Sequence, residues 1–148
     1  ILDLIYTAKV REDEGGTYGV YVGGQLRKYP TEKAVLQIIF DTAPAKRDKL
    51  MKIIFDELNN FAKAGSTEEN LNKVKEFMLK KHAEDLKENN YWLSGIDEYL
   101  FTGMDRIKNY EQIVNSITMK NIQKFADDLL KQKNEIEVSM ISPEAESK

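Results

Sequence analysis

The chain has 148 residues, of which 41% are hydrophobic and 32% are charged, and its formal net charge is −3. This length suffices for one domain with a single core, and no apolar run approaches the roughly 20 residues that a membrane-spanning helix needs. We therefore expect no membrane span. The 22 basic and 25 acidic residues are spread along the sequence and create no basic surface for phosphates, so we also expect no nucleic-acid partner. The lack of cysteine excludes disulfides, thiolate catalysis and Cys-ligated metal sites, and suits both cytoplasm and periplasm.

The N-terminal part of the sequence predicts a helix followed by two strands. Apolar residues recur at helical spacing from Ile1 to Ala8, and Gly15-Gly16 supplies a stop, because glycine readily adopts the positive φ at which many helices end. The stretch TYGVYV, residues 17–22, alternates with the two-residue period of a strand. A second strand over residues 34–42 follows a polar turn at Tyr29-Pro30. We expect the two strands to pair antiparallel.

The rest of the sequence predicts a series of helices and one returning strand. Pro44 opens the first of these helices and Gly65 ends it, which matches the preference of proline for helix starts and of glycine for helix ends. The residues from Ser66 to Glu69 supply a capping box for the next helix. Further helices are predicted through 91–101, around 110–114 and over 118–129, and alternating apolar residues over 134–142 predict the strand.

These elements describe an α+β domain, in which helices pack on one face of an antiparallel sheet. Three strands make a thin sheet, and the sequence begins within a helical pattern that has no capping residue. We therefore expect the chain to belong to a longer protein whose upstream strands complete the sheet. We place the domain at residues 1–142, and we predict a disordered tail at 143–148 from its charge and its paucity of apolar residues.

The sequence offers little support for a metal site or a nucleotide site. A zinc site without cysteine needs several histidine and carboxylate ligands, whereas His82 is the single histidine and lies at the edge of an apolar helix stripe. The paired glycines follow neither the GxxxxGK nor the GxGxxG pattern of phosphate-binding loops, and we interpret them as turns. Neighbouring residues point about 100° apart on a helix, so we interpret three acidic pairs as solvated faces: Glu68-Glu69, Glu84-Asp85 and Asp127-Asp128.

An aromatic segment, YWLSGIDEYLF, runs from Tyr91 to Phe101. Its rings are suited to a stacking cage for a ligand. Their helical spacing and their mixture with leucine and isoleucine favour the alternative, which is packing in the core.

Arg11 and Tyr18 stand seven residues apart, on either side of the predicted glycine turn. One interpretation makes Arg11 an exposed helix residue paired with Glu12 or Asp13, and Tyr18 an ordinary strand aromatic. The other brings both side chains to one ligand, because the last turn of a helix and the start of the next strand lie close to the same corner. A guanidinium and a phenol both donate hydrogen bonds, which suits them to hold carbonyl oxygens of a substrate. Spacing alone favours the first interpretation.

Several stretches of the sequence together resemble one family of proteins. They are VREDEGGTYGVYV, FDTAP, a long helix ending in AGSTEENL, the segment ENNYWL and a final strand ending at Pro143. In this order they are similar to the C-terminal, non-zinc half of the pitrilysin or insulinase-type zinc peptidases, the inverzincins. The resemblance covers most of the chain.

The resemblance implies a fold, a partner and a role for Arg11 and Tyr18. In that family two homologous α+β halves of the LuxS/MPP type close like a clamshell around a peptide, and the zinc, its ligands and the glutamate base of HxxEH lie in the first half. The second half lends an Arg and a Tyr, seven residues apart around a glycine turn, that hydrogen-bond the substrate backbone. Arg11 and Tyr18 match this pattern. The chain would then bind a peptide substrate beside an N-terminal catalytic half or a partner subunit, with no catalytic residue or metal ligand of its own.

The sequence departs from a complete enzyme of this family and leaves two other functions open. It contains no HxxEH, so we expect the chain alone neither to hold catalytic zinc nor to cleave peptides. Relatives of these halves also serve as noncatalytic partners in processing peptidases and as core subunits of respiratory complexes, although a scaffold has no need of Arg11 and Tyr18. A free-standing module that binds peptides at an exposed strand edge is the other alternative.

Overall fold

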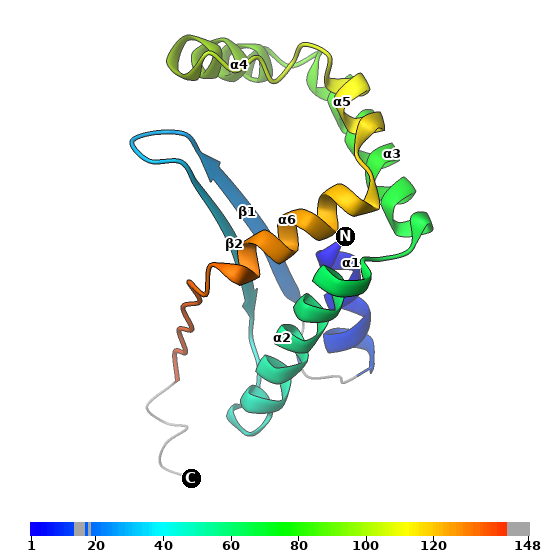
Figure 1. Cartoon of the computed structure of the whole chain (residues 1–148), viewed down its shortest axis with the longest axis vertical. Coiled ribbons are helices and arrows are strands. Elements are labelled where there is room, and N and C mark those ends of the chain that lie inside the picture. The colour runs from blue at the N-terminus through cyan, green and yellow to red at the C-terminus, as the bar shows by residue number, and fades with distance from the viewer. Residues whose placement is uncertain (14–16, 18, 142–148) are drawn as a thin grey trace.

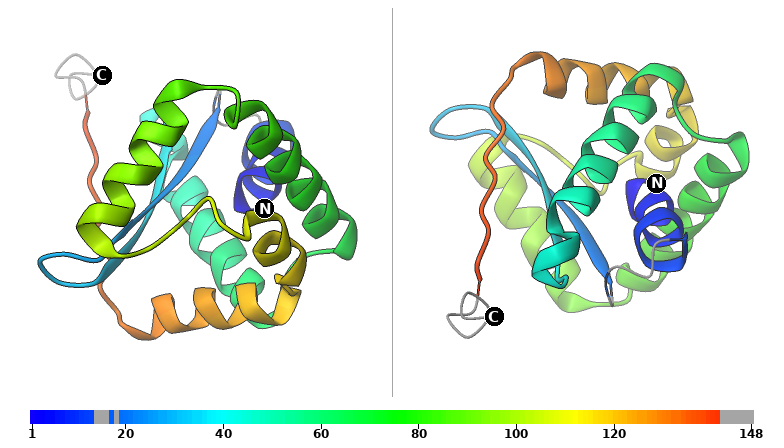
Figure 2. Two further views of the ribbon diagram at one scale, coloured as in Figure 1. Left: turned by 90° about the horizontal axis from the view of Figure 1, so that it is seen from above. Right: turned by 90° about the horizontal axis from the view of Figure 1, so that it is seen from below.

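The computed structural model describes residues 1–13, 17 and 19–141, excluding the side chains of residues 11–13. It confirms the predicted α+β fold (Figure 1). A hairpin packs against the first helices, α3 leads away from this core, and α4 returns to the tip of the hairpin (Figures 1 and 2). The elements are α1 (Leu2–Tyr6), the π-helix η1 (Thr7–Asp13), β1 (Val20–Arg27), β2 (Lys33–Phe40), the 3-10 helix η2 (Pro44–Lys46), α2 (Arg47–Ala64), α3 (Glu68–Asp85), α4 (Asn89–Thr102), α5 (Tyr110–Ser116) and α6 (Met119–Lys131).

The strands β1 and β2 form the predicted antiparallel hairpin, and their register decides which side chains share a face. The register runs from the pair Val20 and Phe40 to the pair Arg27 and Lys33. Because side chains alternate between the faces of a strand, the even-numbered residues of both strands share one face and the odd-numbered residues share the other. The even face points to the core with Val20, Val22, Ile38 and Phe40.

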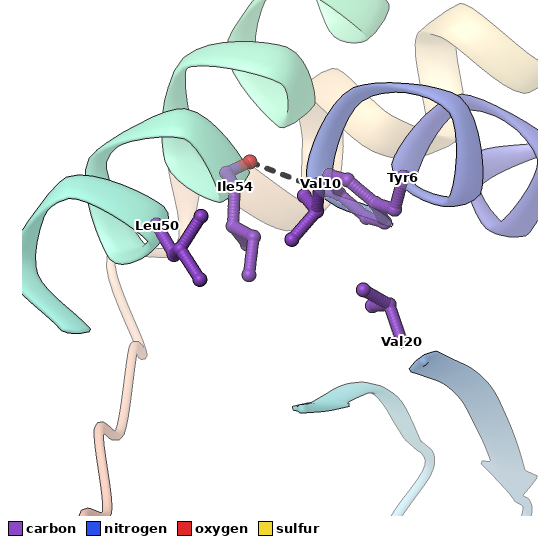
Figure 3. Close-up of a cluster of buried hydrophobic side chains, with 5 residues drawn as sticks. All are labelled: Tyr6, Val10, Val20, Leu50 and Ile54. Atoms are coloured by element: carbon purple, nitrogen blue, oxygen red, sulfur yellow. Dashed lines mark hydrogen bonds between the residues drawn. The ribbon is translucent and has the colours of Figure 1, made fainter. Parts of the chain in front are cut away.

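The main core lies where α1, η1, β1 and α2 meet (Figure 3). It is formed by Tyr6, Val10, Val20, Leu50 and Ile54, all of which are buried. The Tyr6 hydroxyl donates a hydrogen bond to the carbonyl oxygen of Ile54 at 3.0 Å, so the polar atom that this side chain brings into the core has a partner. The cluster joins the N-terminal helix, the start of the hairpin and α2 into one unit.

Helix α2 has the predicted stripe and the predicted end. Gly65 follows it with a φ of +76°, where a side chain would be strained and its Cβ would lie 2.9 Å from Cγ of Met119 on α6. Thr67 then caps α3, because its side chain accepts a hydrogen bond from the backbone N–H of Asn70. The buried side chains of α2 follow the helical period: Leu50, Ile54, Leu58 and Phe61.

The predicted third strand over residues 134–142 is wrong for the part of it that the structure describes. Residues 134–141 join no sheet, and Ile136, Val138 and Met140 are 90%, 79% and 96% exposed. Arg47 holds the segment, through an ion pair with Glu137 and a hydrogen bond from Nε to the Ser139 hydroxyl at 2.8 Å. Alternating apolar residues indicate a preference for extended backbone, but a strand also needs a neighbouring strand to complete its backbone hydrogen bonds. No described strand lies beside this segment.

The expectation that the aromatic segment packs in the core is wrong for most of its residues. Tyr91 is half-buried, whereas Trp92, Tyr99 and Phe101 are exposed on α4. The helix touches the hairpin tip through the ring of Phe101, which lies 5.5 Å from the ring of Tyr29. The helical spacing of the apolar residues predicted the helix correctly, but this spacing does not show whether another element packs on its apolar face.

Candidate functional site

The two residues that the sequence singled out lie at the edge of what the structure describes. Arg11 lies on η1, and its side chain falls outside the description. Tyr18 lies outside the described residues. The contact of this pair with a common ligand therefore stays a prediction, and the geometry that bears on it is that of the segments on either side.

The helical side of the corner is fixed by buried side chains. Val10, which precedes Arg11, is fully buried, and Tyr6 is fully buried one helical turn earlier. The segment Thr7–Asp13 is a π-helix, a conformation that is rare and that occurs frequently at functional sites. Burial, and to a lesser degree the negative charge of Glu57, raises the pKa of the Tyr6 hydroxyl well above its ordinary value. The neutral Tyr6 thus fastens the helix that carries Arg11 to α2.

The raised pKa of Tyr6 predicts a loss of stability at alkaline pH. Tyrosine titrates near about pH 10 in an unfolded chain, and in the folded protein Tyr6 releases its proton only at higher pH. Its contribution is therefore complete below the unfolded pKa and declines as pH rises above it, by at most about 1.4 kcal/mol per pH unit. Urea unfolding at pH 9 and pH 11 should show a larger drop in the free energy of unfolding for the native chain than for Tyr6→Phe. Equal drops would mean that Tyr6 is not the buried, neutral anchor described above.

The strand side of the corner is held by a polar link that spans the hairpin. The Thr17 hydroxyl lies 2.8 Å from the Gly19 carbonyl oxygen and 2.8 Å from Oδ1 of Asp41, and it accepts a hydrogen bond from the Gly19 N–H at 3.2 Å. Asp41 directly follows β2, so this link closes the hairpin just beyond its last strand pair. The residues on both sides of position 18 are thereby fixed to the end of the sheet.

Sequence reasoning did not identify Thr17 or Asp41 as members of the corner. Both lie in stretches that carry the family resemblance, but a threonine and an aspartate 24 residues apart give no pattern by themselves. Their proximity follows only from the strand register. The register opposes Val20 and Phe40, and its continuation by one residue opposes positions 19 and 41, which brings Asp41 to the end of the hairpin near Thr17. Neither side chain has an assigned chemistry beyond this structural link.

The polar residues that were interpreted as structural have structural partners. His82 is buried on α3, with Nδ1 2.9 Å from the Tyr91 hydroxyl and its ring stacked on Tyr110 at a centroid distance of 4.1 Å. Each acidic pair has at least one carboxylate in an ion pair with a lysine one helical turn away: Glu69 with Lys73, Asp85 with Lys81, Asp127 with Lys131 and Asp128 with Lys124. Glu68, Glu69, Glu84 and Asp128 are exposed, as the interpretation of these pairs as solvated faces predicts, whereas Asp85 is half-buried, with its side chain 23% exposed.

In residues 1–13, 17 and 19–141, no three or more His, Cys, Asp or Glu side chains gather into a group that could hold a metal ion. Over the same part of the chain, no helix combines the length and the apolar character that crossing a membrane requires.

Comparison with known proteins connects this corner to a peptidase family. The family model described as the peptidase M16 inactive domain matches residues 5–78, which is half of the chain and includes η1, the corner and the hairpin. Among solved structures, the chain is similar to a protease from Helicobacter pylori, with a TM-score of 0.68 and 15% sequence identity over 86% of this chain. The chain spans 33% of the length of that protease, and at this identity the likeness shows the fold alone. No curated protein matches the sequence.

Proposed function

The chain belongs to the M16 peptidase family, as a non-catalytic domain of the inactive type, and we propose from this premise that it is the substrate-binding half of a zinc-dependent endopeptidase. One observation carries the proposal. The family match covers the corner at which a π-helix and the hairpin end are each fastened to the core, and Arg11 and Tyr18 stand on the two sides of that corner. Such anchoring suits residues that must hold a substrate in one position.

In this proposal Arg11 and Tyr18 bind the backbone of an extended peptide. The guanidinium of Arg11 donates hydrogen bonds to a backbone carbonyl beside the bond to be cleaved. The Tyr18 hydroxyl donates to the carbonyl oxygen at the cleaved bond, where negative charge develops during the reaction. Both groups act on the main chain, so they bind peptides of different sequence.

The catalytic zinc belongs, in this proposal, to the other half of the enzyme. The described residues of this chain hold no group of ligands that fits a zinc ion, which agrees with the inactive-domain type. We call the combination of this chain with its zinc-bearing half, whether on one polypeptide or on two, the assembled enzyme. This chain then orients the peptide, and the zinc-bearing half supplies the metal and the base.

The test is the affinity of the assembled enzyme for a peptide that it cannot cleave. The metal is removed with a chelator, and binding of a fluorescently labelled peptide of about twelve residues is measured by anisotropy. Arg11→Ala should weaken binding by roughly 10- to 150-fold, because a hydrogen bond from a charged donor is worth about 1.5 to 3 kcal/mol. Lys80→Ala, which removes an exposed cation from α3, is the control and should bind as the native enzyme does. Equal affinity of the native enzyme and Arg11→Ala would leave the chain with a scaffolding role instead.

A further inference from the structure

The odd-numbered face of the hairpin carries apolar side chains that no described element covers. Tyr21 and Ile39 lie directly opposite each other, and Val35 follows on the same face. These three side chains are between 51% and 59% exposed, whereas Val20, Val22, Ile38 and Phe40 of the even face lie in the core or pack against it. We call this face, from the pair Tyr21 and Ile39 to the pair Arg27 and Lys33, the hairpin strip. Its apolar end lies beside the corner that holds Thr17 and Asp41.

The ring of Tyr21 lies along the strip rather than away from it. A Cβ added at Gly23 would lie 2.6 Å from Oη and 2.8 Å from Cε1 of Tyr21, so the ring covers the place where a side chain of the next odd-numbered residue would stand. A Cβ added at the neighbouring Gly24 would meet only the Val35 carbonyl oxygen, at an ordinary 3.6 Å. The bare Gly23 thus leaves room for the ring of Tyr21 over the strip.

The far end of the strip carries two cations that form no ion pair with the described residues. Arg27 and Lys33 are directly opposite each other on the same face and are exposed. Like charges at opposed positions of an antiparallel pair repel each other, and neither side chain forms an ion pair with the described residues. The neighbouring Lys28 differs, because its Nζ donates a hydrogen bond to the Thr102 carbonyl oxygen at 2.7 Å. An anion placed between Arg27 and Lys33 would relieve their repulsion.

We propose that the hairpin strip is a second contact surface for the peptide, and that it selects peptides with an acidic group at a defined distance from apolar side chains. Arg27 follows Tyr21 by six positions, which at about 3.4 Å per residue places the two ends of the strip about 20 Å apart. The apolar end receives aliphatic or aromatic side chains near the cleaved bond, and the cationic end receives a carboxylate about six residues further along the extended peptide. This inference rests on the proposed function, because it takes the ligand to be the substrate peptide.

The test compares two labelled peptides in the metal-free assembled enzyme. They have the same apolar residues next to the central bond, and they differ only in having Glu or Gln six residues from it, on either side in separate pairs. The native enzyme should bind one Glu peptide more tightly than its Gln counterpart by roughly two- to tenfold, the range expected for two exposed charge contacts. The preference should shrink in high salt and should vanish in Arg27→Gln/Lys33→Gln. The control Lys80→Gln/Lys120→Gln removes two exposed cations from α3 and α6 and should keep the preference.

The two glycines give an independent test of the apolar end. Gly23→Ala should displace the Tyr21 ring and weaken binding of both peptides by about the same factor, whereas Gly24→Ala should leave binding unchanged. If the two alanine variants bind equally well, Tyr21 takes no part in peptide contact and the apolar half of the strip is refuted.

The outcomes separate this inference from the proposed function. If Arg11→Ala weakens both peptides equally while Arg27→Gln/Lys33→Gln keeps the native preference, the strip is not a peptide surface but the proposed function stands. If neither variant changes any affinity, both proposals fail. If Tyr21→Ser/Ile39→Ser converts a dimer into a monomer and leaves both affinities unchanged, the strip is an interface between copies of the chain, and the peptide assignment is overturned.

Discussion

Replacing Tyr18 by Phe should lower kcat of the assembled enzyme by roughly 100- to 1,000-fold, the cost of removing one preorganised donor to a developing oxyanion. The variant keeps the ring and loses only the hydroxyl. The corner stays fastened by Thr17, Asp41 and the buried Tyr6, so the geometry around position 18 should persist. The loss should therefore fall mainly on kcat, because the interaction strengthens as charge develops. Steady-state hydrolysis of an internally quenched peptide measures both constants.

The matched control for this prediction is Tyr29→Phe. Tyr29 lies at the other end of the hairpin and contacts Phe101 through its ring, so removal of its hydroxyl should leave hydrolysis unchanged. The zinc content of each variant must equal that of the native enzyme, since the proposed role involves no metal ligand. A Tyr18→Phe enzyme with native zinc content and native kcat would remove Tyr18 from the reaction.

Leu50→Ala should reduce the free energy of unfolding of the chain by about 3 to 5 kcal/mol, which is near the upper end for truncation of a buried leucine. Leu50 is 1% exposed and packs in the cluster where α1, η1, β1 and α2 meet. The cavity would open in the same cluster that holds Val10 and Val20. Urea unfolding followed by circular dichroism measures the change.

Leu93→Ala is the control for the core prediction. Leu93 is 64% exposed on α4, so its truncation should change the free energy of unfolding by at most about 0.5 kcal/mol. Equal losses for the two variants would show that the cluster around Leu50 does not dominate the stability of the chain.

The sequence predicted the elements well where a single element carries the whole signal. The stripe of α2 and the glycine after it depend on residues within a few positions of each other, and both occur as expected. The cap of α3 lies one residue later than the predicted capping box over residues 66–69, because Thr67 is the N-cap and its side chain accepts a hydrogen bond from the backbone N–H of Asn70. The hairpin followed from an alternating segment over residues 17–22 and a second predicted strand over residues 34–42, joined by a polar turn. The π-helix at Thr7–Asp13 was not predicted, because an apolar repeat over two turns does not distinguish i+4 from i+5 hydrogen bonding.

The sequence predicted poorly where an element needs a partner. Ile136, Val138 and Met140 alternate as in a strand, yet no described strand completes their hydrogen bonds. Trp92 and Phe101 follow helical spacing, yet they are 45% and 71% exposed, because α4 lies away from the main core and Phe101 meets only Tyr29 among the described rings. Which strand or helix packs beside a segment depends on the tertiary structure, and the local pattern of a single sequence does not specify it.

The candidate site shows the same division. Arg11 and Tyr18 were found through their resemblance to a family pattern, because their spacing alone favours an ordinary helix and strand. The link between Thr17 and Asp41 depends on the strand register, and the hairpin strip depends on which residues share a face. These features required the structure.

The most direct test of the account asks whether position 18 touches the substrate. Tyr18 is replaced by the photoreactive residue p-benzoylphenylalanine in the metal-free assembled enzyme, a labelled peptide is added, and the sample is irradiated. The account predicts a cross-link to the peptide next to the bond that the zinc-loaded enzyme cleaves, reduced by an excess of unlabelled peptide, and no cross-link from the same replacement at the exposed Tyr99 of α4. Equal labelling from both positions, or none from position 18 while the peptide is bound, would contradict the assignment of this chain as the substrate-binding half.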